Sequence, residues 1–111
     1  MTIPQPSGDD PNARHYVVQC RDRADSAALR TATLAAHRAY VDTWESSITL
    51  SGPLITEGGE VRIGQFYVLH IESRSAAEEF IANDPFTKAG LFTSVEVTRI
   101  QLRFLGGRRS G

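Results

Sequence analysis

The sequence predicts an α+β domain whose strands and helices follow one another in the order β-α-β-β-α-β. Two observations predict this order. Apolar residues recur at spacings of three and four in the segments 25–46 and 75–82, as in helices that bury one face. Four further segments read as strands from their β-forming residues or their alternation of side chains: 15–20, 48–54, 62–72 and 95–104. This order is the ferredoxin-like arrangement, in which a four-stranded antiparallel sheet carries two helices on one face.

The first strand and the first helix come from the N-terminal half of the chain. His15 to Cys20 is an apolar run rich in β-forming residues, and a polar break follows it. Asp25 or Ser26 then supplies an N-cap for a helix that we expect to continue to about Ser46. One face of this helix collects most of its apolar residues together with a histidine: Leu29, Thr33, Ala36, His37, Tyr40, Val41 and Trp44. His37 is therefore predicted to point toward the core.

The second half supplies two more strands, a helix and a last strand. Ile48 to Leu54 is followed by a turn at 57–60, and the strand 62–72 is apolar on both faces, which predicts a central position. Ser75, with Glu78 three residues later, matches the capping box of a helix that ends near Ala82. The segment 95–104 alternates as the fourth strand. A second copy of the chain is the simplest cover for the sheet face opposite the helices.

The length of 111 residues corresponds to one domain, which we expect to span 14–106. Residues 1–13, rich in Pro and Asp, are predicted to form a disordered leader, and 107–111 a flexible tail. The formal net charge of −1 gives no electrostatic footprint for nucleic acid. No segment is apolar enough for a membrane span, and the leader lacks the apolar core of a secretory signal. A cytoplasmic protein with a reduced, buried Cys20 is the simplest interpretation.

The segment Asn83-Asp84-Pro85-Phe86 carries the strongest indication of chemistry. Pro85 disfavours helical geometry at Asp84, which places this residue at a chain reversal after the second helix. Asp84 can cap the turn that follows, or its carboxylate can meet His37. A carboxylate that binds an imidazole fixes its tautomer and raises its basicity, which is the minimum needed to remove a proton from a substrate without a metal. The structural alternative is a capping aspartate and a core histidine that do not react.

The remaining candidates are weaker. His15 opens the first strand and His70 lies in the middle of the third, where structural histidines are the more common case. The three histidines lack the spacing of metal ligands, so no metal site is expected. Gly58-Gly59 lacks the lysine and the strand-to-helix context of a phosphate-binding loop and is interpreted as a turn.

Four segments in order resemble the YciI-like (YCII-related) proteins over residues 15–105. They are Tyr16-Val17-Val18, Ala36-His37-Arg38, Ser51-Gly52-Pro53-Leu54, and Asn83-Asp84-Pro85-Phe86 with Ala89-Gly90-Leu91-Phe92. The last is the most specific, since it matches the Asp-Pro-aromatic turn followed by Ala-Gly of that family. The other three carry weight only as an ordered set.

The resemblance implies a dimeric α/β barrel built from two ferredoxin-like protomers and a His–Asp dyad at His37 and Asp84. One activity of the family is dehydrochlorination of a chlorinated hydroxyquinol. The chain departs from the family where members often have Gly-Ser at the start of the third strand, because Gly64-Gln65 stands there. If that serine orients a substrate, Gln65 substitutes an amide or changes the specificity.

Two functional hypotheses follow. The first is a cofactor-independent enzyme, a lyase or isomerase, that acts on a small aromatic or lactone-like metabolite with His37 as base and Asp84 as its orienting carboxylate. Gln65 would then bind the substrate, and apolar walls would come from Tyr40, Leu54 and Phe86. The second is a homodimeric ligand-binding or interaction module in which the His–Asp contact only joins helix to turn. A ferredoxin-like fold hosts both kinds of function.

Overall fold

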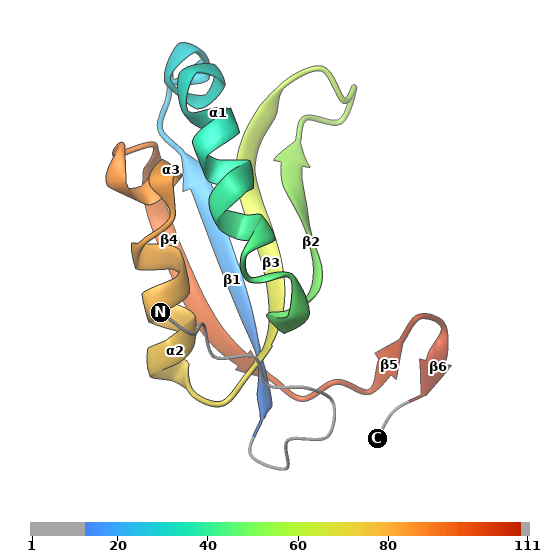
Figure 1. Ribbon diagram of the computed structural model, residues 1–111. Coiled ribbons are helices and arrows are strands. Elements are labelled where there is room, and N and C mark those ends of the chain that lie inside the picture. Colours follow the sequence, from blue (N-terminus) through green and yellow to red (C-terminus); the bar gives the residue numbers. More distant parts are fainter. Residues whose placement is uncertain (1–12, 110–111) are drawn as a thin grey trace.

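The structure, a computed structural model, describes residues 13–109 (Figure 1). The predicted leader, apart from Ala13, and the last two residues of the predicted tail lie outside the described residues. The main sheet contains β1 (Arg14–Asp22), β2 (Ile48–Ile55), β3 (Arg62–Ile71) and β4 (Phe92–Ile100). Its strand order is β2-β3-β1-β4, and all neighbours are antiparallel. The predicted α+β, ferredoxin-like order of elements is confirmed, and β3 is central as expected.

Both long helices, α1 (Ala27–Asp42) and α2 (Arg74–Ala82), pack on one face of this sheet (Figure 1). Successive strand residues point to opposite faces, so alternate residues of β1 and β3 meet the helices. The core lies between these helices and the sheet and contains several aromatic rings. Its central members are Tyr16, Val18, Cys20, Trp44, Tyr67, Leu69, Ile71, Ala77 and Phe80. Burial raises the pKa of the Cys20 thiol to about 12, and the Asp84 and Asp22 carboxylates add to this rise, so it stays protonated. The predicted buried thiol is confirmed.

The first helix is shorter than the sequence predicts. It ends at Asp42 because the backbone tightens there: the N–H groups of Thr43 and Trp44 bond to the carbonyls three residues earlier, of Tyr40 and Val41. A 3₁₀ turn, η1 (Glu45–Ser47), then leads into β2. This change of helix type places Trp44, which is 2% exposed, in the core.

The predicted capping box at Ser75 and Glu78 is wrong. Helix α2 begins at Arg74, because the side chain of Ser73 accepts a hydrogen bond of 3.1 Å from the Ala76 N–H and caps the helix two residues earlier. Ser75 is therefore inside the first turn. Glu78 instead lies 3.6 Å from the guanidinium of Arg74, one helical turn away on the exposed face.

The C-terminal part contains three elements that the sequence did not predict. A short helix, α3 (Pro85–Lys88), follows α2, and the last strand of the sheet runs over 92–100 rather than 95–104. Beyond it, β5 (Phe104–Leu105) pairs with β6 (Arg108–Arg109) in a small hairpin, so the predicted domain and the start of the predicted tail form one ordered element. Figure 1 shows that this hairpin extends away from the four-stranded sheet. We call residues 101–109 the C-terminal arm.

The sheet face opposite the helices, which we call the open face, carries apolar side chains. It consists of the strand residues that alternate with the core, among them Val17, Leu50, Phe66 and Val68, flanked by His15 and His70. Val68 is only 6% exposed, whereas Leu50 is 49% exposed.

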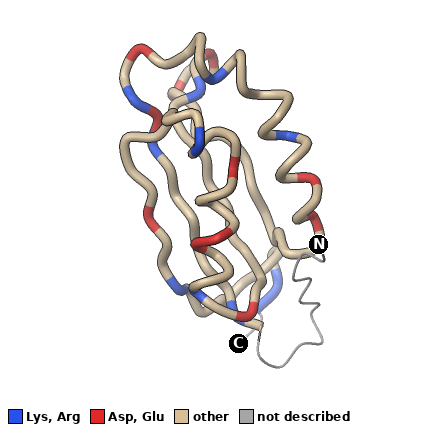
Figure 2. Tube along the Cα trace, turned by 60° about the vertical axis from the view of Figure 1, so that its left-hand side comes forward, with Lys and Arg blue, Asp and Glu red and all other residues tan. Residues whose placement is uncertain are grey.

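Figure 2 shows basic and acidic residues interspersed along the chain, in agreement with a net charge near zero. Among residues 13–109, no helix is both long and apolar enough to cross a membrane.

Candidate active site

His37 lies on the inward face of α1, as the periodicity predicts, and is 6% exposed. The helical repeat places Arg30, two turns earlier, on the same face, and this residue is also 6% exposed. Both side chains point toward α3 and the start of β3, where their partners lie. Two polar groups on the buried face of a helix need partners, because an unpaired polar group in the interior is costly.

Asp84 is fully buried at the N-cap position of α3. Its backbone is extended (φ −63°, ψ 130°), as expected for a residue before proline, and Pro85 occupies the first helical position, where a missing N–H costs nothing. Its Oδ1 accepts a hydrogen bond of 2.9 Å from the Phe86 N–H. The predicted capping role of Asp84 is confirmed, and the capped element is α3.

The same carboxylate binds His37. The distance from His37 Nδ1 is 2.8 Å to Oδ1 and 3.0 Å to Oδ2 of Asp84. A carboxylate only accepts hydrogen bonds, so Nδ1 carries the proton and donates it. In the neutral imidazole this leaves the lone pair on Nε2, which is the nitrogen that can take up a proton. The pair is thus arranged as a base with a fixed tautomer.

Phe86 packs directly on this imidazole. The two rings are parallel within 13°, and their centroids are 3.9 Å apart. Phe86 is fully buried, and the Arg30 guanidinium lies over its ring at 4.7 Å from the centroid. The ring therefore supports His37 from within the protein. A direct contact between Phe86 and a substrate stays a prediction.

Tyr67 and Gln65 extend the site along β3. The Tyr67 hydroxyl donates to Asp84 Oδ2 at 3.3 Å, and Gln65 Nε2 donates to that hydroxyl at 3.4 Å. Burial, followed by the charge of Asp84, raises the pKa of Tyr67 well above its ordinary value, so the hydroxyl stays protonated and can donate. Gln65 is 5% exposed and uses both ends of its amide within the protein. Its predicted role in substrate binding is untested.

Arg30, Asp22 and Tyr67 were missed by the sequence reasoning. Asp22 receives two hydrogen bonds from Arg30, of 2.8 Å from Nε and 3.1 Å from Nη2. A signal for Arg30 was present, because it stands seven residues before His37 and so shares its face. Tyr67 also had a signal, because it lies two residues after Gln65 on the same strand, so both side chains point to the same face of the sheet.

The two other predicted wall residues lie in different surroundings. The Tyr40 hydroxyl donates to the Phe80 carbonyl at 2.7 Å, and its ring packs near those of Phe80 and Trp44 at the edge of the core. Burial raises the pKa of Tyr40 to about 12. Leu54 is half-buried on β2 and pairs with Gly64, the neighbour of Gln65. Their contacts with a substrate stay predictions.

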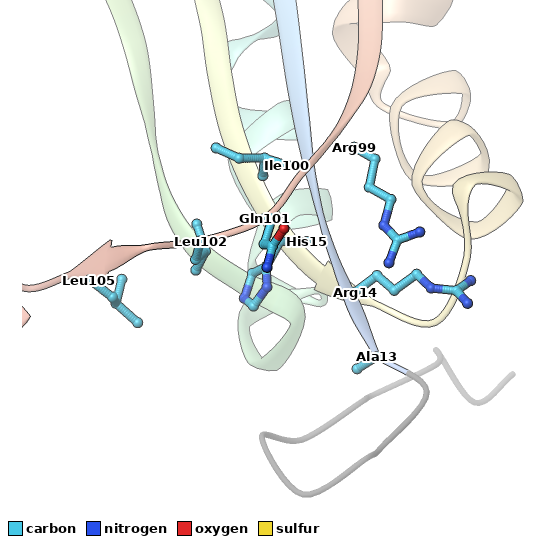
Figure 3. Close-up of a pocket in the computed structure, with 8 residues that line it drawn as sticks. All are labelled: Ala13, Arg14, His15, Arg99, Ile100, Gln101, Leu102 and Leu105. Atoms are coloured by element: carbon cyan, nitrogen blue, oxygen red, sulfur yellow. The ribbon is translucent and has the colours of Figure 1, made fainter. Parts of the chain in front are cut away.

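Three surface hollows, of about 830, 430 and 200 Å³, are lined by residues other than the His37–Asp84 pair. The first lies at the end of β4 beside the start of the C-terminal arm, and Figure 3 shows its lining residues, which include His15, Ile100 and Leu102. His15, near the start of β1, stacks on His70, near the end of β3, with ring centroids 4.4 Å apart. Within residues 13–109, no group of three or more His, Cys, Asp or Glu side chains could hold a metal ion.

Comparison with known proteins assigns the family. The model of the YCII-related domain matches residues 15–101, which is most of the chain. The chain belongs to the YCII-related family. The resemblance noted in the sequence is therefore confirmed. The match ends at residue 101, so nearly all of the C-terminal arm lies beyond the family domain.

Among solved structures, the fold is similar to 5-chloro-2-hydroxyhydroquinone dehydrochlorinase of Burkholderia phenoliruptrix AC1100 in complex with 2,5-dihydroxybenzoquinone. The TM-score is 0.75 at 33% sequence identity, and the match covers 79% of this chain and 94% of that chain. A putative antibiotic biosynthesis monooxygenase of Bacteroides thetaiotaomicron VPI-5482 shares the fold alone, with a TM-score of 0.52 at 10% identity over 89% of this chain and 97% of that chain. No curated protein matches the chain.

Proposed function

We propose that this YCII-related protein is a small acid–base enzyme of the lyase or isomerase type that needs no cofactor. Its substrate would be a small phenolic or lactone-like metabolite, and His37 would be its general base. The observation that carries the proposal is the contact of 2.8 Å between His37 Nδ1 and the buried Asp84 carboxylate, which directs the basic lone pair to Nε2. The likeness to a dehydrochlorinase at 33% identity supports the reaction class.

The chemistry asked of this pair is proton transfer alone. Loss of HCl from a chlorinated hydroxyquinol removes protons from two hydroxyl groups, returns one proton to the chlorine-bearing carbon, and expels chloride. The products are a hydroxyquinone and HCl, so no oxidant or reductant is consumed. A base that accepts a proton from oxygen and donates one to carbon is sufficient, and such a group typically contributes ~10²–10⁴-fold to the rate.

A ligand-binding or interaction module is the second candidate function, and the burial of the pair favours it. His37 is 6% exposed and Asp84 is fully buried, so their contact also joins α1 to α3 as a structural tie. The two functions differ in what the removal of the imidazole does. A structural tie predicts a large loss of stability, whereas an enzyme predicts a loss of turnover in a folded protein.

The test is an assay of chloride release and quinone absorbance with 5-chloro-2-hydroxyhydroquinone, followed by a panel of related phenols and lactones. We expect turnover by the wild type and a loss of ~10²–10⁴-fold in His37→Gln, with the fold retained by circular dichroism. The matched control is Arg38→Gln, the exposed neighbour on the same helix, which should keep wild-type turnover. Wild-type binding of these compounds without any turnover would favour the ligand-binding module.

We also infer that the chain forms a homodimer through its open face. The apolar residues of that face support this inference, and the dimeric α/β barrel is the assembly that the family resemblance implies. A cytoplasmic location stays a prediction of the sequence.

A further inference from the structure

We propose that Arg30 is a positioning residue for the His37–Asp84 pair, with one line of contacts to each partner. The inference deepens the proposed function and rests on it, because it assigns a role in the same site to a residue of α1 that touches neither His37 nor Asp84 directly. The two lines run through Phe86 to the imidazole and through Gln65 and Tyr67 to the carboxylate.

The guanidinium of Arg30 is held in one orientation by four hydrogen bonds. Nε and Nη2 donate to the two oxygens of Asp22 at 2.8 and 3.1 Å, Nη2 also donates to the Gly64 carbonyl at 3.0 Å, and Nη1 donates to Gln65 Oε1 at 2.9 Å. The acceptors come from the end of β1 and the start of β3. Because the guanidinium is planar, hydrogen bonds to this many partners hold it in one orientation. Arg30 is therefore a fixed point between α1 and the sheet.

The burial of this ion pair favours a role beyond stability. The side chains of Arg30 and Asp22 are each 7% exposed, so both charges lose most of their hydration. Such a pair gives weak net stabilisation, and well-packed apolar residues in its place are often neutral or stabilising. A buried pair of this kind is better explained by the geometry that it imposes, and here it imposes geometry on Phe86 and Gln65.

The first line of contacts fixes the plane of the imidazole. Arg30 and His37 stand seven residues apart on α1, about 10 Å along the helix axis. The Phe86 ring packs against both side chains, 4.7 Å from the guanidinium carbon and 3.9 Å from the imidazole centroid. Phe86 is fully buried, and the Phe92 ring lies edge-on to it with centroids 6.0 Å apart, so the Phe86 ring can tilt only if a packed neighbour such as the Arg30 guanidinium moves. The plane of His37, and with it the direction of Nε2, thus depends on Arg30.

The second line of contacts reaches the carboxylate. Arg30 donates a hydrogen bond to the amide oxygen of Gln65. This bond orients the amide so that its Nε2 group points toward the Tyr67 hydroxyl. That hydroxyl then donates to Asp84 Oδ2. The last two contacts, at 3.4 and 3.3 Å, are longer than those at Arg30, so we assign the larger share of the positioning to the Phe86 line.

Two variants separate positioning from stability. Arg30→Lys keeps the charge but loses the planar fork and its contact with the Phe86 ring. The double variant Asp22→Leu/Arg30→Met replaces the ion pair by apolar residues and leaves no buried charge unpaired. Arg38→Met, on the exposed side of the same helix, is the matched control. Two readouts are compared: the NMR resonance of the His37 Nδ1 proton, and kcat and KM for the substrate that the wild type turns over.

We expect the wild type to show a sharp, slowly exchanging Nδ1 proton resonance, and both variants to remain folded and to lose it. We expect kcat to fall about 10- to 100-fold, as a misplaced base predicts, with little change in KM. Retention of the resonance and of wild-type kcat in Arg30→Lys overturns the proposal, and this variant decides alone if the double variant does not fold. If the wild type turns over no substrate, the proposed function fails, and the proton resonance still decides whether Arg30 positions the pair.

Discussion

Asp84 holds three parts of the molecule together with one carboxylate. It caps α3 through the Phe86 N–H, binds His37 of α1 and accepts the hydroxyl of Tyr67 from β3. Each partner is buried, so a loss of the carboxylate leaves donors without acceptors in the interior. Such donors cost far more than the net value of the hydrogen bonds themselves. The stability of the fold is therefore expected to depend strongly on this one side chain.

We predict that Asp84→Ala lowers the free energy of unfolding by about 3 kcal/mol. The estimate combines about 1 kcal/mol for a lost cap with about 2 kcal/mol for the unsatisfied buried donors. Ser73→Ala is the control, since it removes only the cap of α2 and should cost about 1 kcal/mol. Urea unfolding measures both. An equal loss of unfolding free energy in the two variants would show that the contacts of Asp84 with His37 and Tyr67 add nothing to stability.

The tautomer of His37 gives a second prediction at this scale. In Asp84→Asn the amide can still cap α3 through its oxygen, but the charged acceptor opposite Nδ1 is gone. We expect the neutral imidazole to populate both tautomers, which the ¹⁵N shifts of its two ring nitrogens report, and turnover to fall. An unchanged Nδ1–H tautomer in this variant would mean that Asp84 does not orient the base.

We expect His15 to make the stability depend on pH. Burial lowers its pKa below the ordinary value of 6.5, and the neighbouring His70 contributes in the same direction. The unfolded chain thus binds a proton at higher pH than the folded one, so the contribution of His15 to stability is fully present above about pH 6.5 and is lost as the pH falls from there through the lower pKa of the folded state. We predict that His15→Gln flattens the loss between pH 7.5 and 5 in urea unfolding, and that Arg38→Gln does not. A wild-type slope retained by His15→Gln would contradict this.

The site residues that the sequence could predict are those with a local signal. Helical spacing placed His37 inward, and Pro85 placed Asp84 at a chain reversal, which are constraints that a few neighbouring residues set. Spacing places Arg30 and Tyr67 on the inward faces of their elements, but it does not report the contacts with other elements through which these two residues join the site. Gln65 was predicted to bind a substrate because it stands where members of the family often have a serine, but both ends of its amide are engaged within the protein.

At the scale of elements, α3 links the site to the sheet. It ends at Lys88, and Gly90, just after the C-cap residue Ala89, has a φ of +76°, in the left-handed region that glycine adopts without strain. The side chain of Arg23 donates to the Gly90 carbonyl, and its own N–H donates to the Leu91 carbonyl. This turn directs the chain from the capped helix into β4.

We predict that Gly90→Ala destabilises the protein by about 1 kcal/mol through the backbone alone. A Cβ at this position would meet no atom within 4 Å, so steric contact adds nothing. Gly52→Ala is the control, because a Cβ there also meets nothing and its backbone is that of an ordinary strand. It should be neutral or slightly stabilising. Thermal unfolding distinguishes them by a shift of roughly 4–8 °C per kcal/mol, and equal midpoints would refute the backbone argument.

The ends of the helices and strands are the features that the spacing of apolar residues predicts least well. His37, Tyr40 and Val41 were correctly predicted to face inward on α1, whereas Ala36, expected on the same face, is exposed. The predicted end of α1 was wrong, because the switch to 3₁₀ geometry keeps Trp44 in the core and leaves the apolar spacing nearly unchanged. Ser73 and Ser75 are both capping residues by type, and only the backbone conformation decides between them. The hairpin of β5 and β6 is too short for any pattern of alternation to predict it.

At the scale of the whole molecule, the open face and the hairpin of the C-terminal arm expose apolar side chains in a single chain. Phe104 and Leu105 of the arm are 60% and 46% exposed, and a two-stranded hairpin is marginally stable at best without further packing. A second copy of the chain that covers the open face would also lie near the arm, which begins at the end of the sheet where β4 stops (Figure 1).

We predict a dimer in solution by light scattering at micromolar concentration. Leu50→Glu, on the open face, should shift the population toward the monomer, because a charge would be buried at the interface. Val61→Glu is the control, since Val61 is similarly exposed, at 47% against 49%, in the connection between β2 and β3. Phe104→Ser tests the arm in the same way. A wild-type monomer, or a dimer that Leu50→Glu leaves intact, would rule out the open face as the interface.

The three interactions of Asp84, with the α3 backbone, His37 and Tyr67, have a consequence for how such sequences evolve. A descendant that lost its substrate would still be under selection to keep this aspartate, because the fold would weaken without it. The persistence of the pair in a related sequence therefore reports folding as much as chemistry. Residues that face the substrate beyond Nε2 of His37 carry no such second duty, and they are the ones whose drift would mark a change of activity.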